Sequence, residues 1–369
     1  MNKRVAIFIS NLNGGGVKRV YLNLANGLVR QGLQVDLVVG RMGVNNIQQI
    51  PQQVRVFDLN KSRSLFTIRG LVAYLKSVQP DVLLTAQTHI NLIGIIAKII
   101  SRKKTRLVLS EHIDLREVIK HNPKEKLIVR LASFLYRSAD EMVAVSSGVA
   151  ESMVSSLKID RDRIKMIPNP LIGDDLSRLK NEKNDHPWLN QVDVPIAIAV
   201  GRLVPQKDFE TLINAVSEAR RLLDIKLIIL GEGFLRDKLK KKIDELSLCD
   251  HIQLAGNVEN PFKYLSRAKV FVLSSLYEGF PSVLVEAMAC GIPVVSTDCP
   301  SGPREILEDG KIGRLVPVGD VSALGQAIIA TIKNPYSVEA SQKRAMEFNI
   351  TNCTKKYLQV LLPFYEVSE

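Results

Sequence analysis

The stretch 278–300, EGFPSVLVEAMACGIPVVSTDCP, determines how the rest of the chain is interpreted. An apolar run at 270–273 precedes it and predicts a buried strand, and a second run at 293–296 predicts the next one. Between them the sequence predicts a helix over 282–289, with Ser282 as its N-cap and a glycine and a proline at its end. A strand, a helix and a strand in this order form a parallel unit, so the stretch indicates an α/β fold.

Two glutamates of this stretch are candidate ligand-binding residues. Glu278 follows the first predicted strand at its carboxyl end, and Glu286 lies eight positions further on, inside the predicted helix. Ligands of open α/β sheets bind at the carboxyl ends of the strands. Carboxylates accept hydrogen bonds from paired hydroxyls, as sugars and riboses present them, so the pattern favours a polyhydroxylated ligand over a metal ion.

The same alternation of strands and helices fills the rest of the chain. Further strands are predicted at 4–9, 35–39, 54–59, 82–85, 107–110, 142–145, 196–200, 226–230, 252–255 and 313–316. Further helices are predicted at 17–30, 65–78, 90–100, 124–137, 147–157, 209–222, 235–246 and 321–332.

We therefore expect an α/β protein of two Rossmann-like, doubly wound domains that face a cleft. The N-terminal domain is expected over 1–168 and the C-terminal domain over 191–348, joined by a polar linker over 169–190. The tail 349–369 carries a last predicted helix, 351–364, which is expected to pack back toward the N-terminal domain.

Composition bears on the location of the protein and on its binding partners. The four cysteines have no paired short spacing, which indicates reduced thiols in a cytoplasmic protein, and no apolar run is long enough to span a membrane. Residues 1–185 contain 29 Lys and Arg against 16 Asp and Glu, whereas residues 186–369 contain 21 against 22. A solvated surface explains scattered charge, but this asymmetry also suits an anionic partner. Few aromatic residues and no recognisable nucleic-acid module argue for a membrane over nucleic acid.

Glycines and cations at strand ends are typical of phosphate sites. Gly14, Gly15 and Gly16 lie between a predicted strand and helix, where backbone amides and the helix dipole can hold an anion. The loop is neither a GxGxxG fingerprint nor a Walker loop, which argues against a Rossmann oxidoreductase. Gly201-Arg202 ends the first strand of the second domain and Lys207 follows, a pair that suits a diphosphate unless both are surface charges.

Four stretches resemble the retaining, two-domain (GT-B) nucleotide-sugar glycosyltransferases of family four, of the kind that build bacterial polysaccharides and lipid-linked glycans. They are GRLVPQKDFETLINAV at 201–216, LGEG at 230–233, EGFPSVLVEAMACGIPVVSTDCPSGPREIL from Glu278, and GRLVPVGD at 313–320. The resemblance covers nearly all of the second domain. The family usually shows Ala-Glu-Arg after its glycine pair, whereas this chain has Val17-Lys18-Arg19 after Gly16, which weakens any role for side chains there.

The resemblance implies a role for each candidate residue. Glu286 would bind the ribose hydroxyls, and Glu278 would hold the donor sugar together with the backbone of Gly279, Phe280 and Pro281. Arg202 and Lys207 would neutralise the leaving diphosphate at Gly201, and Gly15 and Gly16 would cover it from the N-terminal domain. His112, at the end of the strand 107–110, would contact the donor sugar, with Glu111 as the adjacent alternative.

The expected reaction follows from these roles. A hexose or N-acetylhexosamine would move, with retention, from a nucleotide sugar, by default UDP-linked, to a glycan or a saccharide on a polyprenyl diphosphate, without a cofactor or a metal ion. The alternative is a nucleotide-sugar epimerase of the same fold, which needs no acceptor.

A membrane contact is expected for the N-terminal domain. One basic cluster comprises Lys98, Arg102, Lys103, Lys104 and Arg106, and the predicted helix 124–137 mixes apolar and basic residues. Such a helix can lie on the anionic inner face of a membrane, although an amphipathic helix of an α/β fold more often packs on its sheet.

Overall fold

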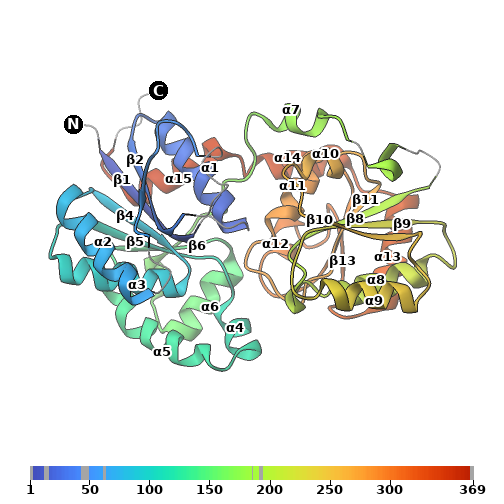
Figure 1. The fold of residues 1–369 in the computed structure, drawn as a ribbon, viewed down its shortest axis with the longest axis horizontal. Coiled ribbons are helices and arrows are strands. Elements are labelled where there is room, and N and C mark those ends of the chain that lie inside the picture. The colour runs from blue at the N-terminus through green and yellow to red at the C-terminus, as the bar shows by residue number, and fades with distance from the viewer. Residues whose placement is uncertain are drawn as a thin grey trace. The chain divides into compact units, whose positions relative to one another are not determined.

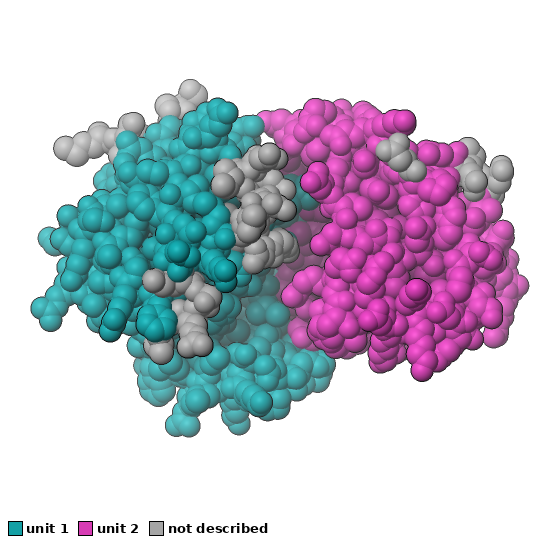
Figure 2. All heavy atoms as spheres, viewed as in Figure 1, with its two compact units in different colours: residues 1–171, 349–369 teal, residues 172–348 magenta. Residues whose placement is uncertain are grey.

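The structure is a computed structural model of the chain and describes residues 3–11, 16–42, 50–60, 64–184, 186–190 and 194–365. It divides into two compact units, coloured separately in Figure 2. Unit 1 comprises Met1–Leu171 and Asn349–Glu369, and unit 2 comprises Ile172–Phe348. Each unit is a parallel sheet with helices, so the predicted pair of doubly wound α/β domains is confirmed (Figure 1).

Unit 1 is built on a parallel sheet whose described strands run in the order β3-β2-β1-β4-β5-β6-β7. The strands are β1 (Arg4–Asn11), β2 (Gln34–Arg41), β3 (Arg55–Asp58), β4 (Val82–Ala86), β5 (Arg106–Glu111), β6 (Glu141–Ala144) and β7 (Ile164–Met166). The helices are α1 (Gly16–Arg30), α2 (Ser64–Val78), α3 (Thr88–Ser101), α4 (Leu115–His121), α5 (Glu125–Leu135) and α6 (Ser147–Leu157). The central strands β1, β4 and β5 are apolar on both faces, because helices cover both sides of a parallel sheet.

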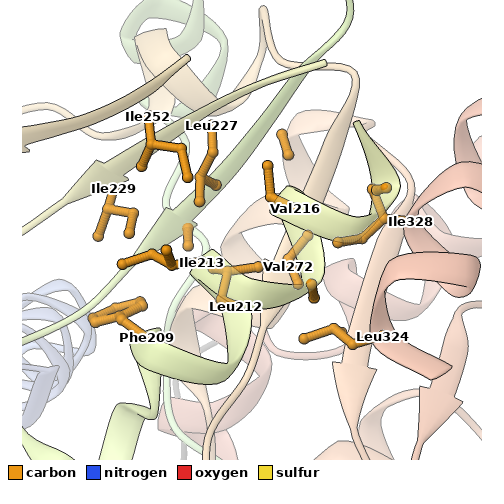
Figure 3. Packing of buried hydrophobic residues seen from close by; sticks show 14 of the residues in the cluster. Phe209, Leu212, Ile213, Val216, Leu227, Ile229, Ile252, Val272, Leu324 and Ile328 are labelled. Carbon is orange, nitrogen blue, oxygen red and sulfur yellow. The ribbon is translucent and has the colours of Figure 1, made fainter. Parts of the chain in front are cut away.

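Unit 2 repeats this plan with the described strand order β10-β9-β8-β11-β12-β13. The strands are β8 (Ile196–Val200), β9 (Lys226–Leu230), β10 (Ile252–Gly256), β11 (Val270–Leu273), β12 (Val294–Thr297) and β13 (Arg314–Val316). The helices are α7 (Leu176–Asn181), α8 (Phe209–Ala219), α9 (Arg236–Glu245), α10 (Phe262–Leu265), α11 (Ser282–Cys290), α12 (Pro303–Ile306), α13 (Val321–Lys333) and α14 (Val338–Met346). Figure 3 shows α8 and α13 packing their apolar side chains on β9, β10 and β11.

Each sheet has one point where the strand order reverses. In unit 1, β1 pairs with both β2 and β4, and in unit 2, β8 pairs with both β9 and β11. The connections that leave β1 and β4 therefore run in opposite directions from the carboxyl ends of these strands, and so do those that leave β8 and β11. This divergence opens a crevice in sheets of this kind, and ligands bind there.

The C-terminal segment belongs to unit 1. Helix α15 (Ile350–Leu361) packs against α1, and Tyr365 donates a hydrogen bond to the carbonyl oxygen of Gln31 at 3.1 Å. The contact is close because Gly27 faces α15: a Cβ atom at this position would lie 2.1 Å from Thr354 Oγ1. A helix at 351–364 that packs toward the N-terminal domain was predicted for this segment.

The segment expected to be a linker, 169–190, differs from that expectation. From Ile172 onward it is part of unit 2, where it forms α7 and a 3₁₀ turn at Pro187–Asn190. Its backbone and polar side chains bond to α10 and the residues that follow it: Asn184 Nδ2 donates to the Lys263 carbonyl at 2.9 Å, and Arg267 donates to that of Glu182 at 2.9 Å. The polar composition that suggested a linker reflects these bonds instead.

Several local predictions were incomplete. β7, α4 and α14, and the short helices α10 and α12, were not predicted from the sequence. Ser282 is the first residue of α11 and not its N-cap, which is Pro281 with φ of −72°. A proline here has no side-chain acceptor, so no capping hydrogen bond forms.

Candidate active site

In unit 2, the loops that leave β8 and β11 are tied together at the reversal point. The backbone amide of Leu276 donates to the Gln206 carbonyl at 2.8 Å, and Gln206 Nε2 donates to that of Tyr277 at 2.9 Å. Ser274 Oγ donates to the carbonyl of Lys207 at 2.8 Å. These bonds fix the two loops that carry the predicted Lys207 and Glu278.

Lys207 and Glu278 form a buried ion pair. Lys207 Nζ bonds to Glu278 Oε1, and Ser275 Oγ donates to the same carboxylate oxygen at 2.6 Å. The two side chains are only 15% and 8% exposed. Removing one partner would leave the other charge buried without compensation, which is strongly unfavourable. The pair therefore holds a cation and an anion together at the carboxyl ends of β8 and β11.

Arg202 is the second cation of this edge. It is exposed, and the ion pairs of the described residues do not include it. Its loop is held by the turn Gly231-Glu232-Gly233 after β9, since Leu203 N donates to the Glu232 carbonyl at 2.9 Å. Gly231 has φ of +141°, and a Cβ there would lie 1.9 Å from the Gly201 carbonyl oxygen. Only glycine allows this approach, which sets where Arg202 leaves the strand.

The loop after Glu278 is equally constrained. Glu278 N donates to the Pro300 carbonyl at 3.2 Å, and the ring of Phe280 packs edge-on against Phe348 at 5.3 Å. Gly302 has φ of +103°, and a Cβ there would lie 2.5 Å from Pro281 Cδ. The backbone of Gly279, Phe280 and Pro281 is thus held in one conformation. The loop leads into α11, where Glu286 is 6% exposed.

In unit 1, His112 follows β5 directly and lies in a cluster of hydroxyl groups. Its Nε2 is 2.8 Å from Tyr21 OH and 3.1 Å from Ser110 Oγ. Burial lowers the pKa of His112 to about 4, so the imidazole is neutral at physiological pH. A neutral imidazole offers one N–H donor and one acceptor nitrogen.

Glu111, the alternative to His112, is fully buried at the end of β5. Its carboxylate accepts hydrogen bonds from Tyr136 OH, from Asn91 Nδ2 at 3.1 Å and from Thr88 Oγ1 at 3.2 Å. Burial nevertheless raises its pKa to about 7, because these neutral donors offset only part of the lost hydration. Glu111 faces its own network and holds the start of α3, which argues for a structural role.

Two models of known families match this chain, one in each unit. Residues 14–171 match the model described as Glycosyltransferase Family 4, and residues 180–348 match the model described as Glycosyl transferases group 1. The chain belongs to these glycosyltransferases.

Relatives of this glycosyltransferase agree with the assignment. An uncharacterized glycosyltransferase of Methanocaldococcus jannaschii is 32% identical over 64% of this chain and 60% of its own length. N-acetylgalactosamine-N,N'-diacetylbacillosaminyl-diphospho-undecaprenol 4-alpha-N-acetylgalactosaminyltransferase of Campylobacter jejuni is 29% identical over 98% of this chain and 100% of its own. The crystal structure of Anabaena HepE in complex with UDP and glucose superposes with a TM-score of 0.81 at 20% identity, covering 98% and 100% of the two chains. That likeness identifies the GT-B fold.

The predicted site residues of the glycosyltransferase fall into two groups. Arg202, Lys207, Glu278 and Glu286 belong to unit 2, whereas His112 and Gly16 belong to unit 1. Gly16 begins α1, and a Cβ there would meet nothing within 4 Å. Gly14 and Gly15 lie outside the described residues. Among the residues that are described, no three His, Cys, Asp or Glu side chains gather as metal ligands; metal independence stays a prediction.

Sequence reasoning did not find Ser275 or Tyr21. Ser275 directly follows Ser274 at the end of β11, and a hydroxyl so close to a strand end could have been noted as a partner for Glu278. Tyr21 lies among the buried apolar residues of α1 and carries no signal of its polar contact.

Proposed function

We propose that this glycosyltransferase transfers a hexose or N-acetylhexosamine from a UDP-sugar, with retention, to a saccharide carried on a polyprenyl diphosphate. The observation that carries the proposal is the buried Lys207–Glu278 pair beside the exposed Arg202 at the reversal point of the second sheet. A diphosphate needs cations and a sugar needs hydroxyl acceptors, and this edge supplies both within one pair of loops. The Campylobacter relative is named for a diphospho-undecaprenol acceptor, and the HepE structure is named for UDP and glucose.

Each residue then has a chemical task. Glu286 accepts hydrogen bonds from the ribose hydroxyls, and Glu278 with the backbone at 279–281 orients the donor sugar. Arg202 and Lys207 stabilise the negative charge that develops on the leaving diphosphate, and preorganised cations do this without reorganisation during the reaction. His112 donates a hydrogen bond to the sugar, and the predicted phosphate role of Gly15 and Gly16 stays a prediction.

The chemistry is displacement at the anomeric carbon through an oxocarbenium-like transition state. Neither Glu278 nor Glu286 needs to act as a general acid or base, because the diphosphate leaves as a stabilised anion. Arg202 and Lys207 would supply the charge that a metal ion supplies in other transferases.

The donor is identified by incubating the protein with UDP-, GDP- and ADP-sugars and measuring nucleotide release with and without a polyprenyl-diphosphate saccharide. Release that depends on the acceptor supports the transferase. Turnover of the sugar without an acceptor would support an epimerase instead.

Substitution tests the roles of the side chains. Arg202→Ala should remove roughly 2–4 kcal/mol of transition-state stabilisation, which is measured as a fall in kcat/KM. Arg221→Ala is the matched control, since this exposed arginine follows α8 at the far end of that helix from Lys207. Glu286→Ala should weaken UDP binding in calorimetry. Equal kcat/KM for the two arginine variants would refute the diphosphate role of Arg202.

The acceptor proposal includes peripheral contact with anionic lipid through unit 1, which holds 28 Lys and Arg against 14 Asp and Glu. Within the described residues no helix is long and apolar enough to cross a membrane. The basic cluster near Arg102 is partly neutralised, because Lys98 pairs with Asp140 and Arg106 pairs with Glu141. The support therefore comes from another element, α5.

The outer surface of α5 combines apolar and basic side chains. Its inner face, with Val129 and Ala132, is buried where α5 packs against α3 and α6. Its opposite face shows Leu127, Leu131 and Phe134, which are 74%, 48% and 67% exposed at helical spacing. The exposed basic residues along or beside this helix are Lys124, Lys126, Arg130 and Arg137. An apolar stripe between cations fits the interface of an anionic bilayer.

Flotation with phosphatidylglycerol-containing and pure phosphatidylcholine vesicles tests this contact. Binding should require the anionic lipid, weaken with salt, and fall in Leu127→Ser/Phe134→Ser. Leu222→Ser is the matched control, because this leucine of unit 2 is 75% exposed. Equal, negligible binding to both vesicles would refute the contact, and self-association through the stripe in light scattering would assign it to a second copy instead.

A further inference from the structure

We infer that Tyr21 is a positioning residue for His112. Its hydroxyl donates to Nε2 of the imidazole, holds the neutral tautomer with the proton on Nδ1, and leaves that N–H as a donor at the carboxyl end of β5. The inference rests on the proposed role of His112 at the donor sugar.

The geometry of the Tyr21–His112 contact carries the inference. Tyr21 is fully buried, and its hydroxyl lies 2.8 Å from His112 Nε2. The two rings meet edge-on, with centroids 5.4 Å apart and planes at 60°. Both the hydroxyl and the ring of Tyr21 therefore orient the imidazole, and Tyr21→Phe removes the hydroxyl while it keeps the ring.

The acidity of the neighbouring hydroxyls indicates which of them donates to His112 Nε2. Nε2 faces two hydroxyls, Tyr21 OH and Ser110 Oγ. A phenol is more acidic than an alcohol, so the Tyr21 proton is the better donor to a nitrogen lone pair. A neutral imidazole has one protonated nitrogen, so when Nε2 accepts, Nδ1 carries the proton. The lowered pKa of His112 agrees with a neutral ring.

The positions of these residues in the fold connect them to function. Tyr21 lies in α1, the helix that begins at the glycine loop, so one helix both starts at the predicted phosphate turn and orients the imidazole. Tyr357 of α15 is fully buried beside this cluster. Burial raises its pKa to about 12, and the neighbouring hydroxyls of Ser110 and Tyr21 oppose that rise. The C-terminal helix α15 thus lies beside the two side chains that contact His112.

Nitrogen NMR of the histidine side chains tests the tautomer without any ligand. The chain has five histidines, and His112→Gln assigns the signal. The wild-type protein should show Nδ1–H and an unprotonated Nε2 at neutral pH. An Nε2–H signal from His112 would overturn the inference, whatever the variants do.

Tyr21→Phe keeps the ring and removes the hydroxyl. We expect a mixture of tautomers at His112 and a kcat about tenfold lower with the UDP-sugar that the donor screen identifies, with a KM for that donor close to wild type. Ser110→Ala should retain the Nδ1–H tautomer, because Tyr21 still donates. A wild-type nitrogen spectrum and kcat in Tyr21→Phe would overturn the inference.

The two proposals fail in different ways. A wild-type transfer rate in His112→Ala would remove the proposed role of His112 and leave the tautomer result unchanged. The Nε2–H tautomer in the wild-type protein would remove the role of Tyr21 and leave the sugar contact of His112 intact.

Discussion

Glu111 and His112 are neighbours at the end of β5, yet burial shifts their pKa values in opposite directions. The pKa of Glu111 rises to about 7 and that of His112 falls to about 4, because a buried site disfavours the charged form of both. Glu111 keeps its proton better in the folded state, so its contribution to stability is lost as the pH rises. His112 binds its proton less well when folded, so its contribution is lost as the pH falls below its ordinary value of 6.5.

Glu111→Gln separates the two effects. Between pH 4.5, the ordinary pKa of the acid, and about pH 7, the unfolded chain releases the Glu111 proton while the folded chain retains it. The wild-type protein should therefore lose up to about 3 kcal/mol of stability relative to the variant as the pH rises through this window. Urea unfolding at a series of pH values measures the difference in the free energy of unfolding between the two proteins. The contribution of His112 is the same in both and cancels. Parallel stability profiles would contradict the raised pKa.

At the residue scale, the sequence indicated that Lys207 and Glu278 follow strand ends of unit 2 but not that they pair. Glu278 and Lys207 could be placed at strand ends because the alternation of strands fixes those ends. Their direct ion pair could not be predicted, since it depends on the loops bonded through Gln206 and Tyr277. His112 was found from its place after β5, whereas its tie to Tyr21 depends on the way α1 packs on the sheet.

At the scale of elements, the packing of α1 on α15 depends on a single missing side chain. Gly27 of α1 faces Thr354 of α15, and an added Cβ would lie 2.1 Å from Thr354 Oγ1 and 3.0 Å from its Cβ. Rotation of the threonine can relieve the first contact but not the second. The two helices are thus in contact at nearly the closest distance that their backbones allow.

Gly27→Ala should therefore destabilise unit 1 by about 1–3 kcal/mol. This is the reverse of the gain of about 1 kcal/mol that alanine gives over glycine in a helix interior. Thermal unfolding measures the change, and Gly27→Ala/Thr354→Ala should recover part of it, since the double variant removes the Oγ1 clash. A more stable Gly27→Ala protein would show that α15 is packed less closely than described.

Long, periodic elements were predictable, whereas short ones were not. Strands such as β4 and β9 are continuous apolar runs that sequence identifies directly. β7 is three residues long, and only Ile164 of the three is buried, so it carries no pattern. α14 buries only Ser341 and Ala345, so it carries little of the apolar periodicity that predicts a helix.

At the scale of the molecule, unit 1 is discontinuous in sequence and unit 2 is not. A chain that ends at Phe348 loses α15 and the buried side chains that it contributes, among them Cys353, Tyr357 and Leu361. Unit 2 keeps all of its residues in such a chain. The two units should therefore respond differently to this truncation.

Trp188, the single tryptophan of the sequence, lies in unit 2 under the ammonium of Lys226, 4.7 Å from its ring centroid. Its fluorescence should report an unfolding midpoint close to wild type in the chain that ends at Phe348. Hydrogen exchange in α1 and β1 should become much faster, because the face of α1 that packed on α15 is exposed. Equal loss of protection in both units would show that they unfold as one.

The return of the last residues to unit 1 also sets an order of events during synthesis. Residues 172–348 leave the ribosome before α15 does, so unit 2 can close its core while unit 1 still lacks this helix. The hydroxyl cluster beside His112 receives Tyr357 only after unit 2 has been synthesised. A nascent chain therefore completes the loops that carry Lys207 and Glu278 before it completes the surroundings of the His112 imidazole.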